Sequence, residues 1–499
     1  MTWNKTTFTA LGLALAAGVA ACDQGLTEVN RNPNAPETVS PALLFSTAAV
    51  STLRQARSAQ ELTPSGIALW AQYLAEYQYP EISYYQFRPS TADAWWNTWY
   101  SGPLADLEQA LRATTANARP NQTGPILVVR AFAFSTMTNM WGDIPFTEAA
   151  KGDLGNFTPL YDTQAFIYDS LLKDLAAANT MMGPSAGTGF GAQDPVYGGD
   201  ATEWKRFANS LRARLGMNLS GRDAARAQAE VAAAVAAGGF TSNADNAQIS
   251  WPGDGVNNNP WWDNQAPPAG QGTRDDARAS ATLIDTLQSL NDPRLPVWFR
   301  PVQDPTCGSV PLCTPVAPGG YRGMPNGLEA GPAASWGTRA SRLSFQVTAA
   351  SQPSYYMTYA EFAFIKAEAA QRGWITGSAA QFYYDGIRAS MEQWGVPNAS
   401  IVAYLAQPSV LYTPATGLQQ IALQKWIALF TSGVEGWFEW RRTGVPNLTP
   451  AFNARTVGGV IPRRITYPQT EQSYNNANLQ TAITAQGGNE LHQRLWINP

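Results

Sequence analysis

The amino-acid sequence predicts a mainly α-helical fold. Apolar residues recur at helical spacing along most of the first half and again after residue 355, while stretches with strand-like alternation are few. Hydrophobic residues make up 44% of the 499 residues and aromatic residues 11%, which is enough to fill a large core. We therefore expect a helical scaffold at about 40–240 and 355–445, with a loop-rich part at about 241–354.

Start and stop signals place the helices of the first half. Ser40 suits the N-cap of the first helix, and Pro41 suits its first position because a proline lacks the N–H that is unpaired there anyway. A later helix stops at Asn291-Asp292-Pro293, since proline cannot continue a helix. The expected helices cover residues 41–57, 65–77, 92–114, 125–140, 163–182, 202–219, 222–237 and 277–290.

The most informative helix pair spans residues 359–395. Its first helix carries alanines and aromatic residues on one side and ends at Gly373, and the second begins near Ser378. Two helices within about 34 residues, with small side chains where they cross, resemble a tetratricopeptide unit. A final helical stretch is expected over residues 418–442. Its apolar stripe contains Ala422, Leu423, Trp426, Ile427, Phe430, Val434, Trp437 and Phe438.

Long irregular segments between the helices carry many aromatic residues. Loops of this length are usually functional, and indole or phenol rings can stack on the apolar face of a sugar. The aromatic residues in or beside loops are Trp251, Trp261, Trp262, Trp298, Trp336, Tyr84 and Tyr85. Among them we expect ligand contact at Trp261, Trp262 and Trp336, with Tyr84 and Tyr85 as a second platform, all outside the core. In contrast, Trp95, Trp96, Trp99, Trp426, Trp437 and Trp440 lie on patterned helices and are interpreted as core residues.

The N-terminus has the layout of an export signal. Lys5 precedes a short apolar run at 8–17, and small residues lead to Cys22. The pattern resembles a bacterial lipobox, which predicts a signal peptide at 1–21, a mature chain that begins at Cys22, and a lipid anchor on that cysteine. The alternative is an ordinary cleaved signal followed by a chance cysteine. Asp23 directly follows the expected lipidated cysteine, a position that can influence lipoprotein sorting. The membrane leaflet in which the anchored protein ends up is therefore left open.

The other two cysteines, Cys307 and Cys313, are expected to form a local disulfide. An exported chain meets an oxidising compartment, and the intervening residues are rich in Gly, Ser and Pro. Two free thiols are the alternative.

Charge and histidine content exclude several functions. A net charge of −4 gives no electrostatic footprint for nucleic acid. The only histidine, His492, lies near the C-terminus, so a Ser-His-Asp triad has a single candidate base and a zinc site with several histidines is excluded. Glu435 and Glu439 stand four apart on one helix, as a pair of catalytic carboxylates could, but Arg442 can neutralise them, so we interpret them as a structural ion network. Hence we expect no catalytic residue.

Metal and cofactor sites are not expected either. Oxygen ligands for a structural calcium ion could come from Asp275-Asp276 and from the asparagines at 257–259, but no EF-hand spacing occurs. Phosphate-binding glycine patterns are absent from the sequence.

Ordered motifs along the whole chain resemble the SusD/RagB family of lipoproteins, in its SusD-like branch. The motifs are LTEVNRNPNAP at 26–36, WNTWYSGPL at 96–104, WGDIPFTEA at 141–149, FANSLR at 207–212, NNNP at 257–260, LNDPRLP at 290–296, QKWIALF at 424–430, EWRRTG at 439–444 and IPRRITYP at 461–468. The resemblance implies that residues 22–499 form a single SusD-like domain, a right-handed superhelix of tetratricopeptide-like helix pairs that supports a loop-rich ligand-binding face. It also implies a non-catalytic, surface-exposed outer-membrane lipoprotein that captures glycans or peptides for a TonB-dependent barrel of the SusC type.

Two other functions remain as alternatives. A secreted all-α glycoside hydrolase or lyase would share the length, the aromatic content and the export signal, but the inventory of paired carboxylates argues against it. A periplasmic solute-binding lipoprotein would be α/β, and the sequence has too few strand patterns for that class.

Overall fold

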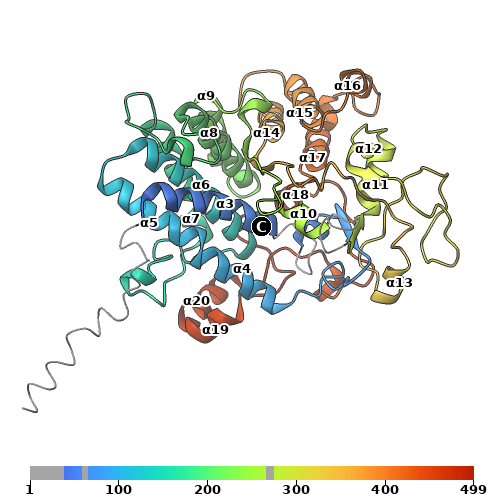
Figure 1. Ribbon diagram of the computed structural model, residues 1–499, viewed down its shortest axis with the longest axis horizontal. Coiled ribbons are helices and arrows are strands. Elements are labelled where there is room, and N and C mark those ends of the chain that lie inside the picture. Colours follow the sequence, from blue (N-terminus) through green and yellow to red (C-terminus); the bar gives the residue numbers. More distant parts are fainter. Residues whose placement is uncertain (1–38, 59–65, 266–274, 499) are drawn as a thin grey trace, which may run out of the picture.

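The computed structural model describes residues 39–58, 66–265 and 275–498. The predicted signal peptide, Cys22 and the motif at 26–36 lie outside these ranges. The described chain is mainly α-helical, as predicted (Figure 1). The helices are α3 (Pro41–Ser58), α4 (Pro89–Ser101), α5 (Pro103–Ala116), α6 (Pro120–Trp141), α7 (Gln164–Met181), α8 (Ala201–Asn218), α9 (Ala224–Ala236), α10 (Pro260–Gln265), α11 (Ala281–Ser289), α12 (Leu295–Trp298), α13 (Ala330–Ala334), α14 (Tyr359–Gln371), α15 (Ala379–Gln393), α16 (Asn398–Leu405), α17 (Gly417–Ala428), α18 (Gly433–Thr443), α19 (Gln469–Tyr474) and α20 (Asn476–Gln486).

Neighbouring helices pack as pairs around one continuous core. The main pairs are α6 with α7, α8 with α9, and α14 with α15, and α14 also contacts α8 and α17. Their buried side chains belong to a single hydrophobic cluster. In the pair α14–α15, a Cβ on Gly386 would lie 2.8 Å from the ring of Phe364, so the close approach of these helices requires a residue without a side chain. The pair predicted at 359–395 is therefore present, with Gly373 following α14 at a φ of +72°.

Several predicted helix boundaries are correct and two long helices are divided. Ser40 Oγ accepts a hydrogen bond from the Leu43 amide at 3.3 Å, in the N-cap role expected for it. The helix expected at 92–114 is broken at Gly102, because Pro103 begins a new helix, α5. The stretch expected at 418–442 divides into α17 and α18, which are joined by residues 429–432.

The prediction of a helix at 65–77 is wrong. Only Ile67–Leu69 form a turn of 3₁₀ helix, Gln72 takes the left-handed conformation with a φ of 56°, and the chain continues as strand β1 (Leu74–Glu76). This strand pairs antiparallel with β3 (Ala277–Ala279), so the helix predicted at 277–290 likewise begins as a strand and becomes helical only in α11. Pairing between segments about 200 residues apart overrides the local helical pattern.

Three short antiparallel ladders hold the loop-rich part in place. One is β1 with β3; the others join β2 (Ala247–Ile249) to β6 (Ser354–Met357) and β4 (Phe299–Arg300) to β5 (Arg342–Leu343). A disulfide between Cys307 and Cys313 closes a further loop. The segments that form these ladders are therefore packed against the scaffold, and Trp251 and Trp298 are buried in the core.

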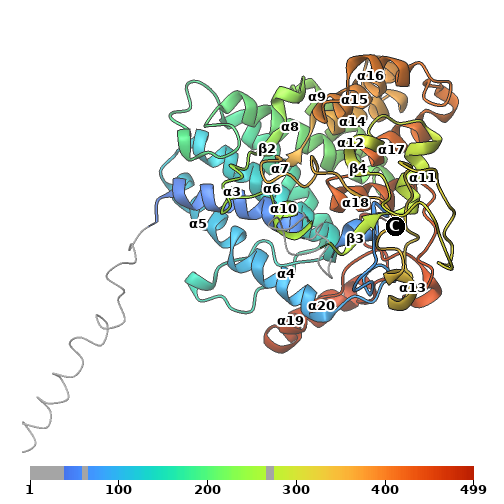
Figure 2. The ribbon, with the colours of Figure 1, turned by 45° about the vertical axis from the view of Figure 1, so that its right-hand side comes forward.

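The C-terminal segment crosses the end of α6. The Arg464 side chain is buried and donates a hydrogen bond to the carbonyl of Trp141 at 2.8 Å, and the Trp141 indole donates to the carbonyl of Thr466 at 3.0 Å. Arg441 of α18 donates to the carbonyls of Arg463 and Asn139. These hydrogen bonds fix the segment that leads to α19 and α20. Both helices lie with α4 at one edge of the molecule (Figures 1 and 2).

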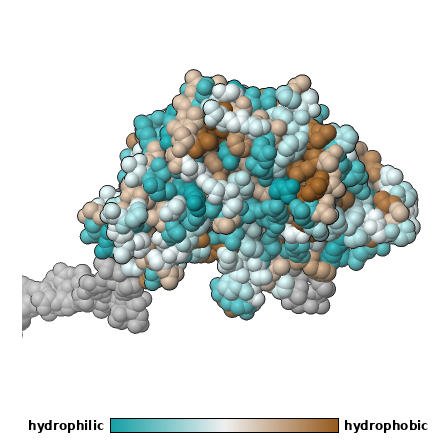
Figure 3. Space-filling model, turned by 90° about the horizontal axis from the view of Figure 1, so that it is seen from above, coloured by the Kyte–Doolittle hydropathy of each residue, from teal (hydrophilic) through white to brown (hydrophobic). Residues whose placement is uncertain are grey.

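One face of the molecule can be judged from its hydropathy. On the face seen in Figure 3, hydrophobic side chains gather in a few separate patches within a largely hydrophilic surface. Across residues 39–58, 66–265 and 275–498, no helix combines the length and the apolar character that a membrane span requires.

Candidate functional site

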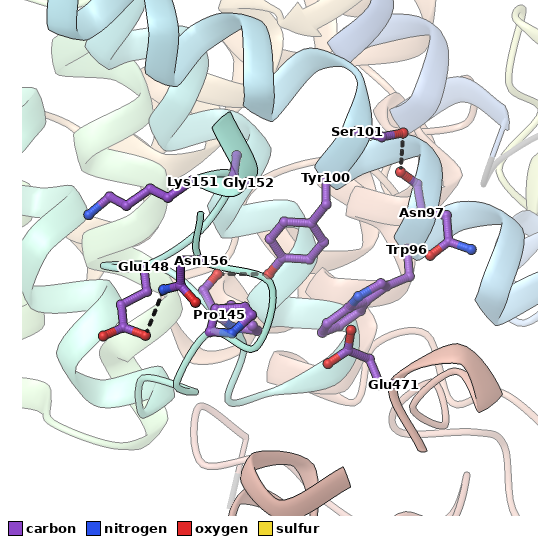
Figure 4. Close-up of a pocket in the computed structure, with 12 residues that line it drawn as sticks. Trp96, Asn97, Tyr100, Ser101, Pro145, Glu148, Lys151, Gly152, Asn156 and Glu471 are labelled. Carbon is purple, nitrogen blue, oxygen red and sulfur yellow. Dashed lines mark hydrogen bonds between the residues drawn. The ribbon is translucent and has the colours of Figure 1, made fainter. Parts of the chain in front are cut away.

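A groove of about 310 Å³ lies between α4, the segment 145–159 and α19 (Figure 4). Trp96, Asn97, Tyr100 and Ser101 come from α4, Glu471 comes from α19, and the loop after α6 supplies the remaining wall. The loop residues that line it are Pro145, Glu148, Ala150, Lys151, Gly152, Asn156 and Pro159.

The sequence of α4 explains why this helix forms a wall of the groove. Trp96 and Tyr100 are four residues apart, as are Asn97 and Ser101, so the two pairs form adjacent rows on one side of the helix. The rings of Trp96 and Tyr100 lie 4.9 Å apart, and Trp96 stacks on Tyr161 with a centroid distance of 6.1 Å. Asn97 and Ser101 are exposed, so the groove combines an aromatic wall with a polar rim.

Hydrogen bonds fix the aromatic wall. The Tyr100 hydroxyl donates to the carbonyl of Pro145 at 2.7 Å, which joins α4 to the loop that follows α6. Trp96 is 3% exposed and only borders the groove, whereas Tyr100 is partly exposed. Burial raises the pKa of Tyr100 well above its ordinary value, so its hydroxyl stays a neutral donor over the physiological pH range.

Two carboxylates and one ammonium group border the groove. Glu148 Oε2 accepts hydrogen bonds from the Leu160 amide at 2.9 Å and from Asn156 Nδ2 at 3.2 Å, and these bonds lower the pKa of Glu148. Glu471 Oε2 accepts from the Tyr161 hydroxyl at 2.6 Å. Lys151 Nζ donates to the carbonyl of Thr147 at 2.6 Å. The charged groups are thus held in place by the surrounding chain.

A second cavity of about 280 Å³ continues the groove along α5. Tyr100, Ser101, Ala150 and Gly152 line both cavities, so the two are neighbours. At its far end Arg112 and Asp153 form an ion pair at 2.5 Å, which leaves that part of the groove without net charge. Together the cavities offer a ligand an elongated path of polar groups beside an aromatic wall.

The structure corrects the predicted stacking residues. Trp261, Trp336 and Tyr85 are only 3%, 1% and 2% exposed, so none of them presents a ring face to solvent. Trp261 lies edge-on to Phe430 in the main core, and Trp336 belongs to a separate small cluster with Met324 and Leu328. Trp261 and Trp336 lie in the loop-rich part, which the three ladders join to the scaffold. The Tyr85 hydroxyl accepts a hydrogen bond from the Ala451 amide at 2.8 Å.

The other two predicted contacts remain partly exposed. Trp262 and Tyr84 are both half-buried, and neither lines the groove. Arg455 lies over the Tyr84 ring at 5.6 Å and pairs with Glu329 at 2.8 Å. The prediction that Trp96 is a core residue is confirmed. The groove beside Trp96 was not predicted. The paired spacing of aromatic and small polar residues along α4 was the available signal.

The carboxylates Glu435 and Glu439 belong to a buried ion network. Arg214 of α8 pairs with Glu435 of α18 at 3.4 Å, and Lys425 of α17 pairs with Glu439 at 2.9 Å. Arg442 contacts Glu439 at 2.6 Å. These buried ion pairs match the structural network expected from the sequence, and neither glutamate lines the groove.

The same network continues into α14. Arg214 also pairs with Glu361 at 2.5 Å, and Arg442 pairs with Glu368 at 2.6 Å. Burial raises the pKa of Glu368, but the positive charges of Arg442 and Arg372 outweigh that effect and hold it at about 2. Burial also raises the pKa of Glu435. The cations keep Glu368 ionised in the folded protein although its side chain is only 5% exposed.

The carboxylates considered for calcium have other partners. Asp275 pairs with Arg278 at 2.9 Å and with Arg342 at 2.9 Å. Among the residues that the structure describes, no group of three or more His, Cys, Asp or Glu side chains could hold a metal ion.

Comparison with known proteins places the chain in a family. A SusD-like family model with the description "Starch-binding associating with outer membrane" matches residues 33–468, which is most of the chain. The chain belongs to this SusD-like family. The resemblance seen in the sequence motifs is thereby confirmed, and the family description associates the chain with the outer membrane.

Solved structures share the fold over nearly the whole length. A chitin-binding protein is 28% identical with a TM-score of 0.78, covering 92% of this chain and 100% of that one. A Bacteroidetes SusD-like protein is 25% identical with a TM-score of 0.76, covering 92% and 100%. A chitin-binding SusD homologue from Flavobacterium johnsoniae has a TM-score of 0.75 at 24% identity, covering 92% and 98%. The predicted fold class, mainly α with tetratricopeptide-like pairs, is confirmed. No curated protein matches the SusD-like chain.

We predict that Glu368→Gln removes an acid-sensitive part of the stability. The folded-state pKa of Glu368 lies near 2, below the ordinary 4.5, so its stabilising effect is present above pH 4.5 and is lost as the pH falls toward 2. Breaking a buried pair costs about 3 to 5 kcal/mol at neutral pH. Urea unfolding across this pH range measures both effects.

The matched control is Glu392→Gln on α15, whose side chain is half exposed and pairs only loosely with Arg388 at 3.7 Å. It should change the free energy of unfolding by less than about 1 kcal/mol. An equally small effect of Glu368→Gln would show that the network does not hold the fold together.

Proposed function

We propose that this SusD-like protein captures glycans in the groove between α4 and α19 and passes them to a TonB-dependent barrel of the SusC type. The observation that supports glycan capture is the groove itself. Its wall presents the partly exposed ring of Tyr100, against which the buried Trp96 packs, and exposed amide and hydroxyl groups stand beside Tyr100. A sugar ring offers an apolar face and a rim of hydroxyl groups, which such a wall and such a rim complement.

The family description and the relatives suggest which glycans to try first. The family model is described as starch-binding, and two similar structures are of chitin-binding proteins. Identity of 28% or less leaves the contact residues free to differ, so substrate choice follows from the side chains of this groove. We therefore propose starch-derived and chitin-derived oligosaccharides as the first ligands to measure. Peptides remain the alternative ligand class.

The groove suits binding better than hydrolysis. A glycosidase needs one carboxylic acid with a raised pKa to protonate the leaving oxygen, beside a second carboxylate. In this groove, hydrogen bonds from the Leu160 amide and Asn156 lower the pKa of Glu148, which favours the ionised form. A non-catalytic role is consistent with the family, whose members are binding proteins.

Membrane attachment is proposed from the sequence. The lipobox-like residues before Cys22 support a lipid anchor there, on a mature chain that begins at that residue and faces the cell exterior as a single domain. An anchored protein of this kind could rest on an outer-membrane barrel and keep a captured glycan close to the transport path.

We predict that Asn97→Ala weakens oligosaccharide binding without changing stability. Asn97 is exposed on the groove side of α4, and alanine is well tolerated in a helix, so the melting temperature should be unchanged. Loss of one hydrogen bond to a sugar hydroxyl should weaken binding about fivefold in calorimetry with chitin-derived and starch-derived tetramers. Thr98→Ala, one residue further and outside the groove, is the control.

Equal affinities of the wild type and Asn97→Ala for a bound tetramer would show that α4 does not contribute to the binding site. Release of new reducing ends during the incubation would instead favour the hydrolase alternative.

We also predict that Cys22→Ala releases the protein from the membrane fraction. The substitution removes the thiol that would carry the lipid, and the wild type should show the corresponding added mass in mass spectrometry. A variant that still sediments with membranes, together with a wild type that carries no lipid, would show that the anchor assignment is wrong.

A further inference from the structure

The charge balance of the groove favours a positively charged ligand. Two carboxylates, Glu148 and Glu471, border it, against one ammonium group, Lys151. Figure 4 shows the Lys151 side chain extending away from Trp96 and Tyr100, and its Nζ is engaged by the carbonyl of Thr147. The ion pair of Arg112 with Asp153 in the adjoining cavity adds no net charge.

Each of the two carboxylates keeps one oxygen for a ligand. Both use Oε2 to accept hydrogen bonds from the protein: Glu148 from the Leu160 amide and Asn156, and Glu471 from the Tyr161 hydroxyl and Asn475. Within the described part of the chain, Oε1 of neither residue accepts a hydrogen bond, and neither oxygen is buried. The carboxylates are therefore oriented by the fold and still able to accept.

The two carboxylates stand on opposite sides of the aromatic wall. In Figure 4, Glu471 lies beside Trp96, and Glu148 lies on the far side of Pro145 and Tyr100. A protonated amine beside either carboxylate can donate to its remaining Oε1, because an ammonium group has three N–H donors and one positive charge. A neutral N-acetyl group offers one N–H donor and no charge.

We propose that the groove prefers glycans with free, protonated 2-amino groups, such as deacetylated chitin oligosaccharides, over their N-acetylated equivalents. This inference rests on the proposed glycan-binding function and names the substrate class at the same groove. Glu148 and Glu471 are the specificity-determining residues, and the partly exposed Tyr100 serves both ligand types.

A matched ligand pair tests the preference. Calorimetry on the full mature protein compares the fully deacetylated and the fully N-acetylated β-1,4-linked glucosamine tetramer at mildly acidic pH, where the sugar amine is protonated. The deacetylated tetramer should bind about fivefold more tightly, the effect of a partly exposed charge pair. Raising the salt concentration should reduce that ratio because salt screens exposed charges.

Charge-removing variants assign the preference to the two carboxylates. Glu148→Gln, Glu471→Gln and the double variant keep oxygen acceptors for the same protein donors, and in the double variant the ratio should fall to about twofold or less. Glu490→Gln, an exposed glutamate outside the groove, removes the same charge and should keep the wild-type ratio.

Three outcomes overturn the inference. Tighter or equal binding of the N-acetylated tetramer by the wild type contradicts it and leaves glycan capture standing. A preference that survives in the folded double variant assigns the selectivity to other residues. Failure of both tetramers and of the starch-derived tetramer to bind contradicts the proposed function as well.

Discussion

The position of the groove depends on a buried ion network that joins α8, α14, α17 and α18. Burying a charge is costly unless it meets a partner, so a shift of any of these helices would leave an unpaired charge in the core. From α18, the Trp437 indole donates to the carbonyl of Pro462, and Arg441 donates to the carbonyls of Arg463 and Asn139. This fixes the segment that leads into α19, and α19 brings Glu471 to the groove opposite α4.

Most of the helical scaffold could be predicted because its determinants are local. Apolar spacing, the Ser40 cap and the glycine after α14 act within a few residues, and the structure has these helices within a few positions of the expected ends. The helix expected at 65–77 failed for the opposite reason. Its apolar residues suit a helix, but β1 pairs with β3 about 200 residues away, and Gln72 turns the chain before that strand. A local sequence pattern cannot indicate a pairing strand that lies so far away in the chain.

The site was harder to predict than the fold because it combines three distant segments. Loop position suggested that Trp261 and Trp336 would be exposed, yet the ladders bury them, since a long loop that pairs with the scaffold becomes part of the core. The actual groove joins α4, the loop after α6 and α19, and only the family motifs at 96–104 and 141–149 touched it. The ion network, in contrast, was foreseeable in part, because Glu439 and Arg442 are neighbours on one helix.

Hydrogen–deuterium exchange with and without a bound chitin-derived or starch-derived tetramer tests the central claim most directly, because it locates the ligand without a substitution. The account predicts slower amide exchange in the loop at 150–158, which lines the groove with Lys151, Gly152 and Asn156. It predicts no change around Tyr84 and Trp262. Protection confined to those two regions, with none in the loop at 150–158, would contradict the assignment of the groove as the glycan site.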